Sequence, residues 1–381
     1  MATTYDPTNS LASAPPLGWN SYNPFGGQHG LPDDWDRSLP GKVALSEKLI
    51  LETADAIVDS GLRDAGYRYV NIDDRWQDPR QPRGEDGLLR PDPRRFPHGM
   101  KFIGDQLHDR GLKFGIYAVA NVYACGGEEG SGPQGLPATG SLGREPEDAG
   151  LFAEWGVDFL KVDWCGTDLA KNHGRAEEIF GMWDMAIKDS GRGIVLSAST
   201  YGEENEENWA PRLTHMWRTT PDLHATWESI LSIAHATSSP RFSSLAGTDA
   251  GWNDPDMLHV GHKNLTFEES QTHLALWAMM RAPLLLGNDV RRMSPELRDL
   301  LMNPVVLRID QDVVGEASFK TEGEWELWSR TLSDGKTAHL AVNLSSRSLD
   351  LPNGHFLDNE LIALGNPEQA VPAHGCVLSI E

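Results

Sequence analysis

The feature that most restricts the fold is a repeated alternation of short apolar runs with helical patterns. Between the first two apolar runs, at 17–20 and 67–74, apolar residues such as Ile50, Ala54 and Ile57 recur at helical spacing. Further helical patterns surround 102–108, 147–155 and 266–280. A strand–helix–strand order that repeats predicts parallel pairing with right-handed crossovers. We expect eight strands, at 17–20, 67–74, 113–118, 158–164, 193–199, 215–220, 241–247 and 282–289.

Eight such strands within residues 1–312 favour a (β/α)₈ TIM barrel over an open sheet. An open doubly wound sheet would usually carry GxGxxG after its first strand, and that motif is missing. The pattern changes after Asp312, where GEWELWSR, a turn LSDG and KTAHLAVNL indicate an antiparallel hairpin. LIALG and CVLSI indicate further short strands. We therefore predict a catalytic α/β barrel at 1–312 and a small antiparallel β-sandwich domain at 313–381.

The chain is acidic, with a formal net charge of −23. This charge argues against partners that are nucleic acids or anionic membranes, and it permits a neutral substrate. The start, MATTYDPTNSLASAPP, shows no signal peptide, and no apolar run approaches the roughly 18 residues of a membrane helix. We expect a cytoplasmic protein, or a secreted one if a signal was removed. The sequence does not predict an oligomeric state.

Polar residues follow nearly every expected strand. Lys161 and Asp163 are two residues apart in one strand, so their side chains point to the same side. The carboxyl ends of barrel strands form one rim, where barrel enzymes place their chemistry. We therefore expect a site at this rim, built from residues that include Asn20, Asp73, Asp74, Tyr117, Lys161, Asp163, Arg218, Asp222, Asp254, Asp256, Asn288 and Asp289.

The residue types at the rim favour a neutral sugar as ligand. Carboxylates alone would also suit a divalent metal, as in a metal-dependent lyase or aldolase. Tryptophans and a tyrosine are interleaved with the acids, however, and aromatic rings can stack on the C–H faces of a sugar while acids bond its hydroxyls. A phosphate would call for a glycine-rich loop and more Lys and Arg. A glycoside hydrolase would need two carboxylates flanking the glycosidic bond; a non-catalytic sugar-binding protein would not.

Several motifs resemble glycoside hydrolase family 27, the α-galactosidase and α-N-acetylgalactosaminidase family. They are PPLGWNSYNPFGG, YVNIDDRW, DPRRFPHGMKFIGDQLHDRGLKFGIYA, ACGG, WGVDFLKVDWC, WRTTPDLHATW, AGWNDPDML and LWAMMRAPLLLGNDVRRMS. They extend in the family's order from Pro15 to about Asp312. The resemblance implies a retaining glycosidase that releases terminal α-linked galactose without metal or cofactor.

The resemblance also implies roles for individual residues. Asp163 matches the nucleophile and Asp222 the general acid/base, whose carboxyl groups should lie about 5–5.5 Å apart in a retaining enzyme. Asp73 and Asp74 match the pair that binds the sugar O4 and O6 hydroxyls. The other substrate-binding matches are Trp19, Tyr117, Cys125, Lys161, Arg218, Asp256 and Met257.

Two departures from the family pattern stand out. Arg75 replaces the usual cysteine of YINIDDCW, which removes one common disulfide, whereas Cys125 and Cys165 match a disulfide in the wall of the site. Two reduced thiols are the alternative for a cytosolic protein. After the fifth strand, LSASTYGEENEENW replaces a Cys-Glu-Trp element. We expect Ser197 and Ser199 in the sugar-binding wall, with Tyr201 as a further candidate, and Glu203–Glu207 in a solvated loop. The preferred sugar could then be N-acetylgalactosamine, β-L-arabinopyranose or the glucose of an isomalto-oligosaccharide.

Overall fold

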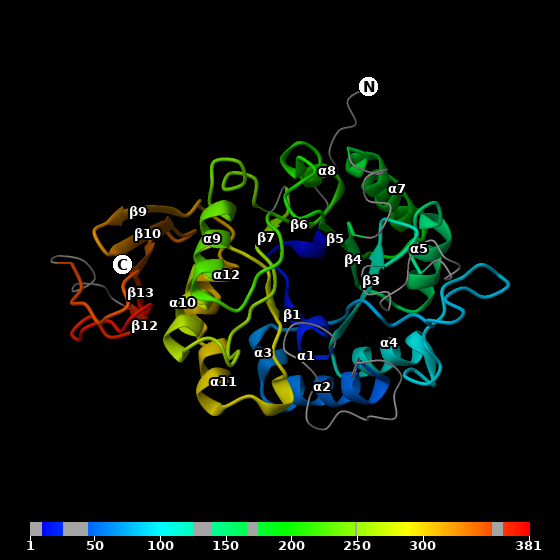
Figure 1. Ribbon diagram of the computed structural model, residues 1–381, viewed down its shortest axis with the longest axis horizontal. Coiled ribbons are helices and arrows are strands. Elements are labelled where there is room, and N and C mark those ends of the chain that lie inside the picture. The colour runs from blue at the N-terminus through cyan, green and yellow to red at the C-terminus, as the bar shows by residue number, and fades with distance from the viewer. Residues whose placement is uncertain (1–9, 26–44, 125–138, 166–173, 248–249, 353–360) are drawn as a thin grey trace. The chain divides into compact units, whose positions relative to one another are not determined.

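The structure is a computed structural model that describes residues 10–25, 45–124, 139–165, 174–247, 250–352 and 361–381 (Figure 1). One sheet contains eight strands in the order β7-β6-β5-β4-β3-β2-β1-β8, and pairing from β1 to β6 is parallel. The strands are β1 (Leu17–Asn20), β2 (Tyr69–Ile72), β3 (Lys113–Val119), β4 (Phe159–Asp163), β5 (Val195–Ser199), β6 (Met216–Arg218), β7 (Trp252–Asp254) and β8 (Leu284–Leu286).

A parallel bridge joins the two ends of this strand order. Leu258, shortly after β7, pairs with Leu286 of β8, and its N–H donates to the carbonyl of Leu285 over 2.8 Å. The N–H of Gly287 returns a bond of 2.9 Å to the carbonyl of Leu258. Pairing between the terminal strands is what distinguishes a barrel from an open sheet. The predicted (β/α)₈ barrel is therefore confirmed.

The helices follow the strands as the apolar spacing predicts. In α2 (Glu47–Asp59), Ser46 caps the first turn by accepting the N–H of Leu49, and Leu49, Ile50, Ala54 and Ile57 are buried along one side. The other α-helices within the described residues are α1 (Tyr22–Phe25), α3 (Leu62–Ala65), α4 (Gly99–Asp109), α5 (Glu145–Glu154), α7 (Ala176–Asp189), α8 (Ala210–Leu213), α9 (Trp227–Thr237), α10 (Phe267–Met280), α11 (Pro295–Leu301) and α12 (Pro304–Gln311).

The strand predicted at 241–247 is wrong. Backbone N–H groups of Phe242 and Ser243 both donate to the carbonyl of Ser239, so this segment forms turns and cannot join a sheet ladder there. The seventh strand lies a few residues later, at Trp252–Asp254, after a tight turn in which Gly251 has a φ of 114°. The segment 241–247 therefore forms turns, and the short segment Trp252–Asp254 forms the seventh strand of the barrel.

The C-terminal residues form an antiparallel sheet of five strands in the order β12-β13-β11-β10-β9. The predicted hairpin is confirmed, since β10 (Trp325–Thr331) pairs with β11 (Thr337–Asn343). LIALG and CVLSI contain β12 (Leu361–Leu364) and β13 (Cys376–Ile380), whereas β9 (Ser318–Glu322) was not predicted. Trp325 and Val377 belong to a buried cluster on one side, against which Leu349 and Leu351 pack. An isolated bridge from Leu349 to Val371 covers this side of the sheet.

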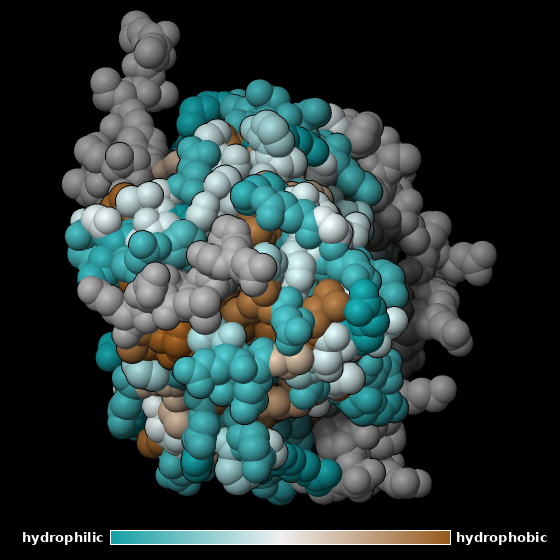
Figure 2. All heavy atoms as spheres, turned by 90° about the vertical axis from the view of Figure 1, so that its left-hand side faces the viewer, coloured by the Kyte–Doolittle hydropathy of each residue, from teal (hydrophilic) through white to brown (hydrophobic). Residues whose placement is uncertain are grey.

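The internal contacts divide the described residues into two compact units. The first contains β1–β6 with the helices from α1 to α8; the second contains α9–α12, β7, β8 and the C-terminal sheet. The domain boundary predicted between residues 312 and 313 does not coincide with this division into units, and it stays a prediction. Among the described residues, no helix is both long and apolar enough to span a membrane. The face in Figure 2 is mainly hydrophilic, with hydrophobic residues gathered near its middle.

Candidate active site

Asp73, just after β2, is held by residues from the ends of β1 and β4. Its Oδ2 atom accepts the side-chain amide of Asn20 over 2.7 Å and the ammonium of Lys161 over 2.9 Å. Its backbone N–H donates to the hydroxyl of Ser21 over 2.9 Å. The Asp73 side chain is only 2% exposed, and a buried carboxylate needs such donors to stay ionised. The structure therefore brings Asp73 and Lys161 into contact, and it adds a bond to Ser21 that the sequence analysis missed. The role of Asp73 and Lys161 in a sugar-binding site stays a prediction.

Lys161 lies among aromatic rings as well as carboxylates. Its ammonium is 5.5 Å from the ring centre of Tyr117 and 6.0 Å from that of Tyr22. Burial disfavours the ammonium, but the Asp73 and Asp163 carboxylates outweigh this effect and raise the pKa of Lys161 above its ordinary value. Burial, reinforced by Asp163, raises the pKa of Tyr117 well above its ordinary value. Lys161 is thus a fixed cation, and Tyr117 stays a neutral phenol.

Asp163 is the last residue of β4 and is 7% exposed. One of its oxygens, Oδ1, accepts two hydrogen bonds. The backbone N–H of Trp164 donates to it over 2.9 Å, and the phenol of Tyr201 donates to it as well. Donors to the charged form favour an ionised carboxylate and fix its orientation.

Tyr201 reaches Asp163 through an unusual backbone conformation. Its φ is 61°, in the left-handed region that non-glycine residues seldom adopt. The guanidinium of Arg218 lies 5.6 Å from the Tyr201 ring centre. The sequence singled out Tyr201 only as a wall candidate, so its bond to Asp163 was missed. A local signal existed, since a glycine such as Gly202, shortly after a strand, is typical of a tight turn.

The strand register places the two predicted wall serines beside the charged pair. Ser197 lies opposite Lys161 and Ser199 opposite Asp163 in the parallel ladder between β4 and β5. Both serines are buried. The Ser199 hydroxyl finds no hydrogen-bond partner within the described part of the chain. The structure therefore brings Ser197 and Ser199 next to the residues with which they were grouped, and the sugar contacts assigned to them stay a prediction.

The expectation of a solvated loop at Glu203–Glu207 is wrong for two of its glutamates. Glu204 is 5% exposed and Glu206 is fully buried. The Glu204 carboxylate accepts the indole N–H of Trp164 over 3.2 Å and the backbone N–H of Gly174 over 2.8 Å. These donors compensate for the loss of water around the carboxylate. Glu204 therefore supports the segment that directly follows Asp163.

The loop that contains Asp222 belongs to the second unit. Asp222 itself is exposed, whereas Asp256 is buried. The Asp256 carboxylate accepts the backbone N–H of Leu223 over 2.8 Å through Oδ2 and that of Met257 over 2.7 Å through Oδ1. Asp256 also has a left-handed φ of 87°. Its carboxylate thus anchors the chain one residue beyond Asp222. The separation of Asp163 and Asp222, which belong to different units, stays a prediction.

The remaining predicted residues take varied positions. Trp19 is fully buried with its ring edge-on to Phe25, their centres 5.5 Å apart. Asp74 is 5% exposed and accepts the N–H of Arg75, the residue that replaces the family cysteine, over 2.6 Å. Cys165 is disulfide-bonded and Cys376 is free and buried. Cys125 lies outside the described residues, so its pairing with Cys165 and its role in substrate binding stay predictions.

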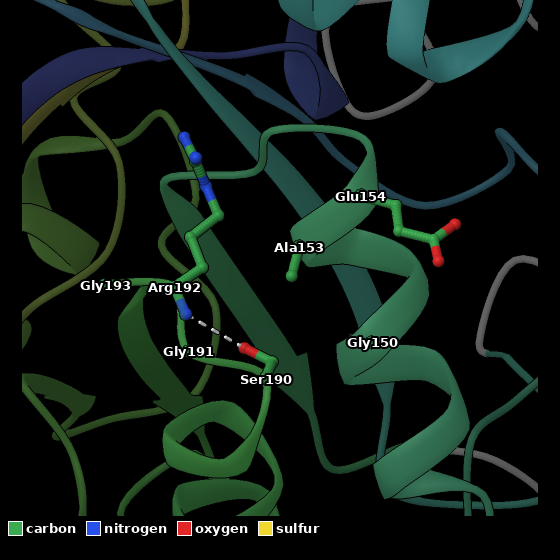
Figure 3. A pocket seen from close by; sticks show the side chains of 7 residues that line it. All are labelled: Gly150, Ala153, Glu154, Ser190, Gly191, Arg192 and Gly193. Atoms are coloured by element: carbon green, nitrogen blue, oxygen red, sulfur yellow. Dashed lines mark hydrogen bonds between the residues drawn. The ribbon is translucent and has the colours of Figure 1, made fainter.

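A surface pocket lies between α5 and the turn before β5 (Figure 3), and none of the predicted site residues lines it. Its lining residues are Gly150, Ala153, Glu154, Ser190, Gly191, Arg192 and Gly193. The Arg192 guanidinium donates hydrogen bonds to the carbonyl of Val157 and to the carboxylate of Asp158, each over 2.6 Å. The turn precedes β5, so the pocket belongs to the amino end of that strand. The carboxyl ends, where Lys161 and Asp163 lie, remain the candidate site.

Comparisons with known proteins identify the family of this chain. The family model described as alpha galactosidase A matches residues 14–312. An α-galactosidase from Cyamopsis tetragonoloba is 38% identical over 89% of this chain and 74% of that protein. An α-N-acetylgalactosaminidase from Gallus gallus is 35% identical over 90% of this chain and 82% of that protein. The crystal structure of α-galactosidase I from Mortierella vinacea has a TM-score of 0.79 and 29% identity, and the match covers 98% of each chain. The chain therefore belongs to the α-galactosidase family, glycoside hydrolase family 27.

Proposed function

We propose that this protein is a retaining exo-α-galactosidase. The observation that carries the proposal is the arrangement at the ends of β2 and β4, in a chain that belongs to this family. There a buried Asp73–Lys161 pair lies next to Asp163, whose carboxylate is oriented by two donors. A glycosidase nucleophile needs this combination, because it must be ionised and must point at a single carbon atom.

The reaction proceeds by double displacement. In the first step Asp163 attacks the anomeric carbon, the bond from that carbon to the leaving oxygen breaks, and protonated Asp222 delivers its proton to that oxygen. In the second step ionised Asp222 removes a proton from water. The water oxygen then attacks the anomeric carbon, and the Asp163 carboxylate leaves. Two inversions give overall retention.

The substrate is a neutral glycoside or oligosaccharide with a terminal galactose. Asp73 and Asp74 bind its O4 and O6 hydroxyls, and Lys161 donates a further hydrogen bond. The other residues of the binding site are Trp19, Tyr117, Cys125, Ser197, Ser199, Arg218, Asp256 and Met257. No metal or cofactor takes part in this mechanism, so we expect full activity in EDTA.

The second candidate function keeps the mechanism and changes the sugar. The buried serines of β5, which stand beside Lys161 and Asp163, favour this alternative because they differ from the family's usual element. The other sugars are N-acetylgalactosamine, β-L-arabinopyranose and the glucose of an isomalto-oligosaccharide.

A panel of substrates tests both candidates. Values of kcat/KM are measured on nitrophenyl α-galactoside, α-N-acetylgalactosaminide and β-L-arabinopyranoside, and on isomaltose. The α-galactoside should give the highest value. A higher value for another member would replace galactose as the substrate. Binding of galactose without hydrolysis of any member would instead show a non-catalytic sugar-binding protein.

A further inference from the structure

The loop between β6 and α9, which contains Asp222, is fastened to α9 at both of its ends. Thr226 caps the helix, and its hydroxyl accepts the N–H of Ser229 over 3.2 Å. At the start of the loop, the hydroxyl of Thr219 lies 2.7 Å from that of Thr237, the last residue of α9. The position of α9 therefore fixes both ends of the loop, and the bond from Leu223 to Asp256 fixes its middle.

The C-terminal sheet and its connections hold α9 near both ends in turn. Near the start of α9, the His374 imidazole stacks on the Trp227 indole, with ring centres 4.4 Å apart and planes 8° from parallel. Near its end, His235 bonds the buried carboxylate of Glu326 in β10 over 2.6 Å. The His235 ring also stacks on Phe319 of β9 with centres 5.0 Å apart. Two separate attachments fix the helix against rotation as well as translation.

His374 is itself held in one orientation. Its Nδ1 atom lies 2.7 Å from the Glu269 carboxylate in the first turn of α10, and its carbonyl accepts the hydroxyl of Thr272 over 2.7 Å. Its φ of 57° lies in the left-handed region, so the connection before β13 is shaped to bring this ring to Trp227. Helices α9 and α10 contact each other and belong to the same unit (Figure 1). His374 thus joins the C-terminal sheet to both helices.

We propose that His374 is a positioning residue for general acid/base catalysis. By stacking on Trp227 it keeps α9, and with it the loop that contains Asp222, where Asp222 can reach the leaving oxygen. This inference rests on the proposed role of Asp222. Proton transfer requires the two heavy atoms to approach within about 2.6–3.2 Å. A misplacement of about 1 Å can therefore cost up to about 100-fold in rate.

The test compares a poor and a good leaving group in the full-length protein. Methanol needs protonation in order to leave, whereas 2,4-dinitrophenolate does not. For His374→Ala we expect kcat/KM on methyl α-galactoside to fall about tenfold or more, and on the dinitrophenyl α-galactoside by no more than about threefold. Trp227→Leu should have the same effect, and the double variant should be no worse than either single one. His339→Ala, which removes a histidine paired with Glu381, is the matched control and should leave both rates unchanged.

The variant Asp222→Ala separates failure of this inference from failure of the proposed function. If Asp222→Ala affects both substrates equally, the assignment of Asp222 as the acid is wrong. If Asp222→Ala shows the leaving-group difference and His374→Ala does not, the positioning role of His374 is overturned. Circular dichroism and thermal melting check that each variant is folded. If His374→Ala is not folded, His374→Asn, which suits a left-handed backbone, undergoes the same test.

Discussion

The two carboxylates assigned to the chemistry have contrasting surroundings. Asp163 ends a barrel strand, is 7% exposed and receives hydrogen bonds from Trp164 and Tyr201 on one oxygen. Asp222 lies on a loop and is exposed, and the structure fixes the backbone beside it, through the bond from Leu223 to Asp256.

This difference suits the two roles proposed for Asp163 and Asp222. A nucleophile must stay ionised and must approach one carbon along one line, so a strand end with fixed donors suits it. An acid/base must exchange its proton with water between the two steps, so it needs solvent access and a well-placed backbone. For Asp163 the structure fixes the side chain itself, whereas for Asp222 it fixes the backbone of the loop.

The variant with the largest expected effect removes the proposed nucleophile. Asp163→Asn keeps the size of the side chain but cannot attack, so kcat on nitrophenyl α-galactoside should fall by about 10⁴–10⁶. Asp105→Asn, on the exposed surface of α4, is the control and should leave kcat unchanged. Substantial residual turnover by pure Asp163→Asn protein would mean that another group is the nucleophile.

Removal of the acid/base should produce a smaller loss that depends on the substrate. Asp222→Ala should lower kcat/KM on methyl α-galactoside by about 10²–10⁴, because methoxide is a poor leaving group without a proton. Formation of the covalent intermediate from the dinitrophenyl galactoside should hardly change, and a burst of dinitrophenolate would report it. An equal loss of kcat/KM on both substrates would contradict the assignment of Asp222 as the general acid/base.

The hydroxyl of Tyr201 tests how far Asp163 depends on its donors. In Tyr201→Phe the carboxylate loses a charge-assisted hydrogen bond, which is worth about 1.5–3 kcal/mol and corresponds to about a 10–100-fold fall in kcat/KM. Loss of this donor disfavours the ionised form, so the acid limb of the kcat/KM profile should move to higher pH. Tyr69→Phe removes a phenol that bonds only Lys113 among the described residues and should leave the limb in place. A profile unchanged in Tyr201→Phe would refute the contribution of this donor.

The smallest effect concerns stability at the start of β6, the strand that leads to the Asp222 loop. His215 accepts the backbone N–H of Leu196 over 3.0 Å, and burial, aided by Lys188, lowers the pKa of His215 to about 4. A folded pKa below the unfolded value means that stability is present above about pH 6.5 and is lost as the pH falls toward 4. In His215→Gln, the loss of unfolding free energy between pH 8 and pH 5.5 should shrink by about 1 kcal/mol. Urea unfolding at both pH values measures this change, and an equal loss in both proteins would contradict it.

The sequence predicted the site best where regular strands carry it. The spacing of Lys161 and Asp163 in one strand was enough to place them on one side, and parallel register then brought Ser197 and Ser199 beside them. The predictions from the sequence were wrong in segments where turns determine the backbone geometry. The apolar run at 241–247 satisfies its backbone within turns, and the run of acids at Glu203–Glu207 concealed a carboxylate, that of Glu204, with buried donors. Neither kind of local hydrogen bonding leaves a periodic pattern in the sequence.

The burial of Glu204 has a consequence for engineering of sugar preference. Its carboxylate bonds the indole of Trp164, next to the nucleophile, and its carbonyl accepts the indole N–H of Trp209. A graft that replaced only Ser197 and Ser199 would keep these bonds. A graft of the whole connection from another family member would strip the segment after Asp163 of its support unless it supplied an equivalent acid. Sugar preference should therefore be changed either at Ser197 and Ser199 alone, or by a graft of 197–209 that carries an acid in the place of Glu204.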